Sequence, residues 1–212
     1  MKNQILIILF LVFISCKNVT EKESENVRVV VDSSKLKTET AQKPTENSIL
    51  TSFLKNPIDL QKFKKSKNIN YTTTSVCNGM DYHFHPKIKD SIFYTYNYPT
   101  KNFKDSKRID QVVVFKHGKN KHTYDDETEV LIELRIFNID SDLGKANLVG
   151  FTKTELELEF GNDYLTLDNR IVYSHKNKVL ILELENSKVK SYRYIKLSSE
   201  KIDTDLIGQI LK

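Results

Sequence analysis

The sequence contains no tryptophan, two cysteines and six glycines among its 212 residues. With so few glycines, it has neither a phosphate-binding glycine-rich loop nor a G-x-S-x-G nucleophile turn. The acidic residues are numerous and scattered, so that no pair of carboxylates is marked out as a general acid and a general base. We therefore expect no enzymatic activity and no cofactor.

The chain also lacks an apolar run long enough to span a bilayer. Its longest run, residues 5–14, has ten residues. A spanning helix needs about 20, because each residue adds about 1.5 Å against a hydrocarbon core about 30 Å thick. Since Lys2 precedes the run, the segment is typical of a secretory signal peptide.

The run ends in Phe13-Ile14-Ser15-Cys16, which resembles a bacterial lipobox, although that family most often has Leu where Phe13 stands. The resemblance implies that Cys16 carries lipid and begins the mature protein. Lys17 follows Cys16 in place of Asp, as in lipoproteins that are passed on to an outer membrane. The implied location is the bacterial cell envelope, at the outer membrane, with the lipid anchor in the bilayer. An ordinary cleaved signal with an incidental cysteine is the alternative.

If Cys16 is acylated, only Cys77 remains, and the mature chain has no intramolecular disulfide. Cys77 follows a β-branched run, which favours a small buried residue; a nucleophile is the alternative if a histidine and a carboxylate converge on it. The mature chain has a formal charge of about +4, which does not by itself indicate a polyanionic partner. The lysine-rich residues 62–67 are interpreted as an exposed helix face, and we expect no nucleic acid partner.

Residues 17–47 contain six basic and six acidic residues and no aromatic residue. A segment so poor in bulky apolar groups cannot offset the entropy lost on ordering, so we predict a disordered tether. Its short apolar patch, residues 27–31, is alternatively an edge strand. The tether would hold the folded part away from the membrane.

Regular apolar patterns begin after the tether. Residues 49–56 predict a short helix capped by Ser48, with Ile49, Phe53 and Leu54 on its buried side. Residues 58–66 predict a second helix. Residues rich in β-branched and aromatic side chains predict strands at 69–76, 91–98, 108–118 and 128–137. In the last of these, alternation predicts that Val130, Ile132, Leu134 and Ile136 share one face, opposite Glu129, Glu133 and Arg135.

The segment 151–161 has a strand-like alternation but three signals for a helix. Thr152 and Glu155 have the spacing of a capping box, Phe151 and Leu156 that of a hydrophobic staple, and Gly161 stands where a left-handed residue ends a helix. We therefore predict a helix. Strands at 163–168, 170–175, 178–185 and 189–197 should follow, with the last two joined as a hairpin.

This order, G-x-T-x-x-x-L-x-x-x-F-G followed by a tyrosine-bearing strand and a hairpin, resembles the small outer-membrane assembly lipoproteins and the β-lactamase-inhibitor-like fold over residues 149–197. Asn162 and Asp163 stand where that family usually has Gly-x-Pro. The resemblance implies an α+β fold with short helices packed on a mainly antiparallel sheet, and a binding or scaffolding role. We predict four regions: a signal peptide (1–15), a lipidated cysteine and linker (16–47), an N-terminal lobe (48–140) and a C-terminal lobe (141–212).

Two groups of residues are candidates for a site. Tyr94, Tyr96 and Tyr98 alternate on one strand and form a candidate binding face for a peptide or glycan; packing beneath a helix or neighbouring strand is the alternative. His83 and His85 would share a strand face with Asp81, which makes them candidate metal ligands. Because no second ligand cluster with a recognised spacing follows, we predict no metal site.

Two functions remain open from the sequence. The first is a membrane-anchored envelope lipoprotein whose non-enzymatic domain binds or scaffolds a protein partner, as an assembly factor or as an inhibitor or immunity factor. The second is an envelope enzyme or metal-binding protein that uses the region of His83 and His85 or of Cys77. A concave pocket where these residues converge would favour the second.

Overall fold

The computed structural model describes residues 48–66, 76–77, 83–86, 88–98 and 109–212. The predicted signal peptide, Cys16 and the tether lie outside the described residues. So do Asp81 and residues 69–75 of the first predicted strand. None of the helices in the described part combines the length and the apolar character needed to cross a membrane.

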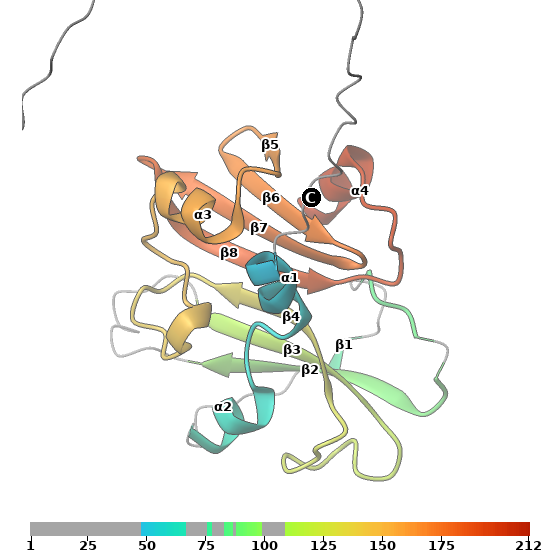
Figure 1. The fold of residues 1–212 in the computed structure, drawn as a ribbon. Helices are drawn as coiled ribbons and strands as arrows, with labels where there is room; N and C mark the ends of the chain where they lie inside the picture. Colours follow the sequence, from blue (N-terminus) through green and yellow to red (C-terminus); the bar gives the residue numbers. More distant parts are fainter. Residues whose placement is uncertain (1–47, 67–75, 78–82, 87, 99–108) are drawn as a thin grey trace, which may run out of the picture. The chain divides into compact units, whose positions relative to one another are not determined.

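The described strands form one sheet in which every neighbouring pair is antiparallel, in the order β1-β2-β3-β4-β8-β7-β6-β5 (Figure 1). The strands are β1 (Val76–Cys77), β2 (Ser91–Tyr98), β3 (Asp110–His117), β4 (Val130–Ile136), β5 (Leu165–Leu167), β6 (Arg170–His175), β7 (Lys178–Glu185) and β8 (Lys188–Lys196). The helices are α1 (Ser48–Lys55), α2 (Leu60–Ser66), α3 (Lys153–Phe160) and α4 (Thr204–Ile210), with a 3-10 turn at Gly144–Ala146. The predicted short helices on an antiparallel sheet are confirmed, and the arrangement is consistent with an α+β or mostly β class.

Strands β4 and β8 lie side by side, with Leu134 opposite Tyr194. The strands of the two predicted lobes therefore form a single continuous sheet. Three hairpin-like steps lead from β1 to β4, and a long connection through α3 then crosses to β5 at the far edge of the sheet. Three further steps, from β5 to β8, bring the last strand back beside β4.

The two faces of the sheet are covered differently. Helices α1, α2 and α3 pack on one face, where α1 lies over the middle of the sheet (Figure 1). Helix α4 packs on the opposite face, where Ile207 and Ile210 contact the apolar side chains of β6, β7 and β8. A smaller apolar cluster on that face contains Phe84, Phe93 and Phe115. Between these two clusters lie the charged side chains of the candidate site.

Helix α3 begins and ends where the sequence predicts. The Thr152 hydroxyl accepts a hydrogen bond from the Glu155 amide at 3.2 Å, and the Thr152 amide donates to the Glu155 carboxylate at 2.7 Å. Gly161, with φ of 82°, ends the helix. Leu156 and Phe160 are buried, so the two local end signals and one apolar stripe define this helix against its strand-like alternation.

Replacing Thr152 with alanine is expected to lower the free energy of unfolding by about 1 kcal/mol, because it removes the side chain that satisfies an unpaired amide of the first turn. Thr154→Ala is the matched control, since Thr154 is exposed within the same turn and alanine favours a helix. Urea unfolding of both variants measures the difference. An equal effect of the two substitutions would contradict the capping role.

The alternation predicted for β4 is wrong in its first half. The register of β4 against β3 shifts between Val113 and Val114, which places a bulge in the ladder. Val130 and Ile132 consequently pack on the face opposite Leu134 and Ile136. The bulge turns the apolar side chains of one strand toward both layers.

The predicted first helix also needs a correction. Leu50 and Leu54 are its buried residues, and Phe53 packs beside them, whereas Ile49 is exposed. The buried pair has the i and i+4 spacing of one helix face. Ile49 lies on the flank of that face because adjacent residues of an α-helix are about 100° apart around its axis.

Candidate functional site

Three arginines lie on the sheet face that α1, α2 and α3 leave uncovered. Arg135 follows the core residue Leu134 in β4, and Arg193 lies between two buried tyrosines in β8. Since successive side chains of a strand point to opposite faces, both arginines point away from the large core. They are directly opposite each other in the β4–β8 ladder, and Arg170 in β6 is opposite Glu183 in β7.

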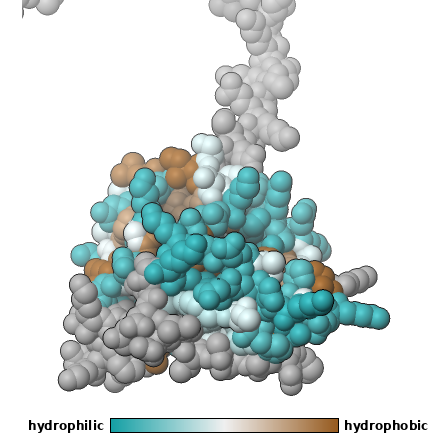
Figure 2. Space-filling view, turned by 90° about the horizontal axis from the view of Figure 1, so that it is seen from below, coloured by the Kyte–Doolittle hydropathy of each residue, from teal (hydrophilic) through white to brown (hydrophobic). Residues whose placement is uncertain are grey.

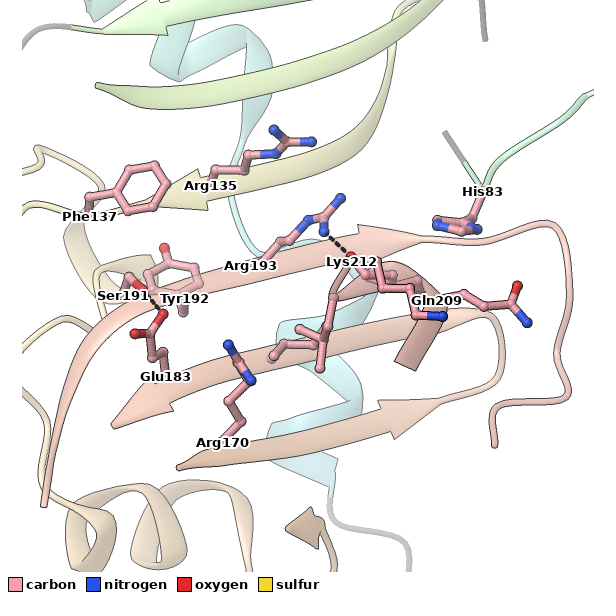
Figure 3. Close-up of a pocket in the computed structure, with 13 residues that line it drawn as sticks. His83, Arg135, Phe137, Arg170, Glu183, Ser191, Tyr192, Arg193, Gln209 and Lys212 are labelled. Carbon is pink, nitrogen blue, oxygen red and sulfur yellow. Dashed lines mark hydrogen bonds between the residues drawn. The ribbon is translucent and has the colours of Figure 1, made fainter. Parts of the chain in front are cut away.

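These arginines line a cavity of about 570 Å³, which is within the size range of ligand sites in proteins. Figure 3 shows Arg135 and Arg193 on neighbouring strands and Arg170 extending from β6 across β7. The apolar part of the lining comes from Ile181 of β7, from Phe137 after β4 and from the end of α4. The lining residues are His83, Arg135, Phe137, Arg170, Ile181, Glu183, Ser191, Tyr192, Arg193, Gln209, Ile210, Leu211 and Lys212.

Glu133 holds two of the arginines in place. Its carboxylate is 1% exposed and accepts hydrogen bonds from the Nε atoms of both Arg135, at 2.5 Å, and Arg193. Arg193 also donates through Nη1 to the Ile210 carbonyl of α4 at 2.7 Å. The side chains of Arg135 and Arg193 remain 36% and 24% exposed, respectively. One buried carboxylate is thus shared by two partly exposed guanidinium groups that face the cavity.

Arg170 and Glu183 form the second charged row of the cavity. Glu183 accepts a hydrogen bond from the Ser191 hydroxyl at 3.3 Å. Arg170 forms no ion pair or side-chain hydrogen bond with any residue that the structure describes. Because it is half-buried and points over the cavity, its guanidinium donors are directed at whatever occupies that space.

His83 lies at one end of the cavity. Burial, together with the positive charge of Arg193, lowers the pKa of His83, so that the imidazole is held in its neutral form. A nearby guanidinium also repels a metal cation. The electrostatics of this end of the cavity therefore suit an anion better than a metal ion.

The structure separates the two histidines that the sequence places on one strand face. Residues 83–86 do not form a strand, and His85 is exposed while His83 faces the cavity. The described residues contain no group of three or more His, Cys, Asp or Glu side chains arranged to hold a metal ion. Cys77 ends β1, opposite Phe93. Cys16 lies outside the described residues.

The three tyrosines of β2 are buried, with Tyr96 only 1% exposed. They pack beneath α2 and the 118–129 loop: Phe63 stacks edge-on against Tyr98 at 4.6 Å, and Tyr124 lies 5.7 Å from Tyr96, both between ring centroids. Tyr94, Tyr96 and Tyr98 therefore belong to the core and form no exposed binding face in the described structure. Of the two possibilities that the sequence left open, packing beneath a helix is the one that the structure shows.

A charged cluster lies beside these tyrosines. Lys64 is buried and paired with Glu129, so the prediction that residues 62–67 form a lysine-rich exposed helix face is wrong at this position. Lys116 is also buried, with its Nζ atom 3.9 Å from the other oxygen of Glu129, and burial lowers the pKa of Lys116. The Tyr96 hydroxyl donates to Glu129 at 2.9 Å. The surface near α2 is otherwise hydrophilic, with small separate apolar patches (Figure 2).

The side chains of Lys64, Lys116 and Glu129 are almost completely buried, and their contacts join α2 and the 118–129 loop to the sheet. Lys64 donates to the Tyr124 carbonyl and Lys116 to the Thr123 carbonyl. Because the ammonium groups are already hydrogen-bonded to protein oxygens, we interpret this cluster as one that stabilises the fold. The arginine-lined cavity is the better candidate for binding.

Sequence reasoning missed the arginines because single charges on a strand resemble an ordinary solvated face. One signal was present. The sequence has 28 lysines but only five arginines, and the three arginines in the described residues all line the same cavity. Arginine is not interchangeable with lysine where a planar, two-pronged donor is needed.

Comparison with protein-family models, with curated proteins and with solved structures finds no match for this chain.

Proposed function

We propose that this protein is a lipid-anchored protein of the bacterial cell envelope, attached to the outer membrane through Cys16, whose folded part binds a protein partner without catalysing a reaction. The observation that carries the proposal is the ten-residue apolar run that ends at Ser15-Cys16 behind a basic start. The partner role is that of an assembly factor, or of an inhibitor or immunity factor.

The arginine-lined cavity supports binding over catalysis. A serine nucleophile needs a base within hydrogen-bond reach. Ser191 and His83, which are the hydroxyl and imidazole groups of the cavity, lie at opposite ends of it (Figure 3). The Ser191 hydroxyl is engaged with Glu183. What the cavity presents instead is a set of partly exposed guanidinium groups, two of them held by Glu133, and such groups recognise anions.

Cys16→Ala is expected to abolish both lipid attachment and membrane association. Without the thiol there is no site for the acyl-bearing group, and the described helices supply no membrane-spanning segment. Intact-mass measurement and membrane fractionation of the native protein test this. Cys77→Ala is the matched control and should keep both the added mass and the membrane location. An unmodified wild-type Cys16, or a Cys16→Ala protein still in the membrane fraction, would contradict lipid anchoring through Cys16.

The binding role has its own test. Crosslinking and affinity capture from wild-type membranes should recover one envelope protein with this chain. The amount recovered should exceed that recovered with a control lipoprotein that has the same signal and tether but another folded part. Enrichment that requires residues 48–212 would support a partner-binding domain. Equal recovery with the control would show that the folded part contributes no specific partner.

A further inference from the structure

The charged groups of the cavity do not cancel. Three guanidinium groups, those of Arg135, Arg170 and Arg193, face two carboxylates, those of the buried Glu133 and the half-buried Glu183. One positive charge is left over. Lys212 lies at the exposed rim, where water screens its charges. His83 adds no charge when it is neutral.

The sheet register places the three guanidinium groups within reach of one ligand. Arg135 and Arg193 occupy adjacent strands in one row. Arg193 is opposite Ile181 of β7, and Arg170 lies one strand further and two residues along. These positions are separated by about 10 Å across the sheet and about 7 Å along it. Two extended arginine side chains can therefore approach a common group above Ile181.

We infer that this cavity binds a carboxylate of an acidic peptide segment, with Arg170 and Arg193 as its donors. The inference rests on the proposed function and names the surface and the chemistry by which the domain recognises its protein partner. A guanidinium group matches a planar carboxylate with two parallel hydrogen bonds. Glu133 fixes the orientation of Arg193 before the ligand arrives, which reduces the entropy lost on binding.

The charge balance selects a carboxylate over a phosphate. The single surplus guanidinium among the half-buried groups matches one negative charge, whereas a phosphate group carries about 1.5 to 2 negative charges near neutral pH. Glu183 stands beside Arg170 and would repel the second charge. The apolar lining from Ile181, Ile210 and Leu211 suits the carbon chain of a peptide.

The test uses the full-length chain in detergent and a fluorescein-labelled hexaglutamate peptide, with binding followed by fluorescence anisotropy. Arg170→Gln should weaken the affinity about tenfold, the effect of one charge-assisted contact. Arg170→Lys keeps the charge but loses the two parallel N–H donors of the guanidinium group, and should weaken the affinity about threefold or more. Lys119→Gln removes the same charge from an exposed turn and should change it less than about twofold.

Glu183→Gln should strengthen peptide binding, because it removes the repelling carboxylate. A misfolded variant would lose affinity, so a gain in affinity cannot result from misfolding. Unchanged or weakened binding in this variant would contradict the charge balance. So would equal losses in Arg170→Gln and Lys119→Gln, since these would indicate only diffuse attraction between a cationic protein and an anionic peptide.

Competition distinguishes the sources of the anion. Acetate, which carries a single negative charge, should displace the peptide at a lower concentration than inorganic phosphate does. The opposite order would overturn the carboxylate assignment. Binding to phosphatidylglycerol vesicles, in a Cys16→Ala background that fails to bind the peptide, would identify a lipid headgroup site in place of a peptide site.

The failure of this inference is separable from failure of the proposed function. If Arg170→Gln captures the same envelope partner from membranes as strongly as the wild type, the partner binds elsewhere and the cavity assignment is wrong while the function stands. If no partner is captured by the wild type, the function itself is contradicted, whatever the peptide titration shows.

Discussion

Glu129→Gln is expected to lower the free energy of unfolding by about 3–5 kcal/mol, which is the usual cost of removing one partner from a buried ion pair. Glu129 is buried between the ammonium groups of Lys64 and Lys116. Glutamine keeps the size and the hydrogen-bonding capacity of the side chain but not its charge. The two lysines would then face each other in the interior without a contacting carboxylate.

The hydrogen bonds around Glu129 explain why local rearrangement would not relieve this loss. Oε1 accepts from Lys64 and, at 3.3 Å, from Gln61 of α2, while Oε2 accepts from Tyr96 of β2. The carboxylate therefore links a helix, a strand and the 118–129 loop. A lysine that moved out to water would have to break the contacts of α2 with the sheet.

Urea unfolding monitored by circular dichroism measures the effect, and Glu127→Gln is the matched control. Glu127 pairs with Lys65 at 4.0 Å, but its side chain is 73% exposed, so the control should cost less than about 0.5 kcal/mol. Adding Lys116→Met to Glu129→Gln should recover part of the stability, because it removes one uncompensated charge. Similar costs for the two glutamate variants would show that the buried cluster contributes no net stability.

The buried lysines illustrate a limit of reading charge from sequence. Residues 62–67 contain several lysines in succession, which indicates a solvated face. Lys65 fits that expectation, but Lys64 points inward because its partner, Glu129, is brought to it by the β3–β4 connection. Nothing within the helix itself marks Lys64 as different from Lys65.

Helix α3 shows the opposite case, in which local signals were sufficient. The capping box of Thr152 and Glu155 and the terminal Gly161 lie within ten residues of one another, and the structure contains both. The strand β4 lies between these extremes. Its alternation correctly indicated a strand, but the bulge opposite Val113 and Val114 depends on the pairing with β3. Because apolar residues continue to alternate on both sides of the bulge, the sequence shows no break at this position.

The candidate site could not be assembled from sequence because its residues meet only through the strand order. Arg135 and Arg193 are neighbours since β8 returns to β4 after the whole C-terminal meander. Glu133, which fixes both, was correctly placed on the face of Arg135. That Glu133 also pairs with Arg193 of β8 could be known only once the strand order was known.

Phe160→Ala is expected to cost about 3–5 kcal/mol of unfolding free energy, the usual range for truncating a buried phenylalanine. Phe160 is 2% exposed. Its ring centroid lies 5.1 Å from that of Phe53 in α1 and 5.6 Å from that of Tyr173 in β6. The ring therefore packs α1 and α3 together on the sheet, and its removal leaves a cavity between three elements.

Leu158→Ala is the control for Phe160→Ala, because Leu158 lies in the same helix but is 81% exposed, and its substitution should change stability by less than about 0.5 kcal/mol. The loss in Phe160→Ala should also be localised. Since α1 packs mainly against α3, β6 and β7, with one hydrogen bond from Tyr194 of β8 to the Leu54 carbonyl, amide hydrogen exchange in α1 should accelerate before exchange in β7 and β8 does. Unchanged exchange in α1, or equal costs for both variants, would mean that α1 is held to the sheet by Leu50 and Leu54 without the aromatic contact.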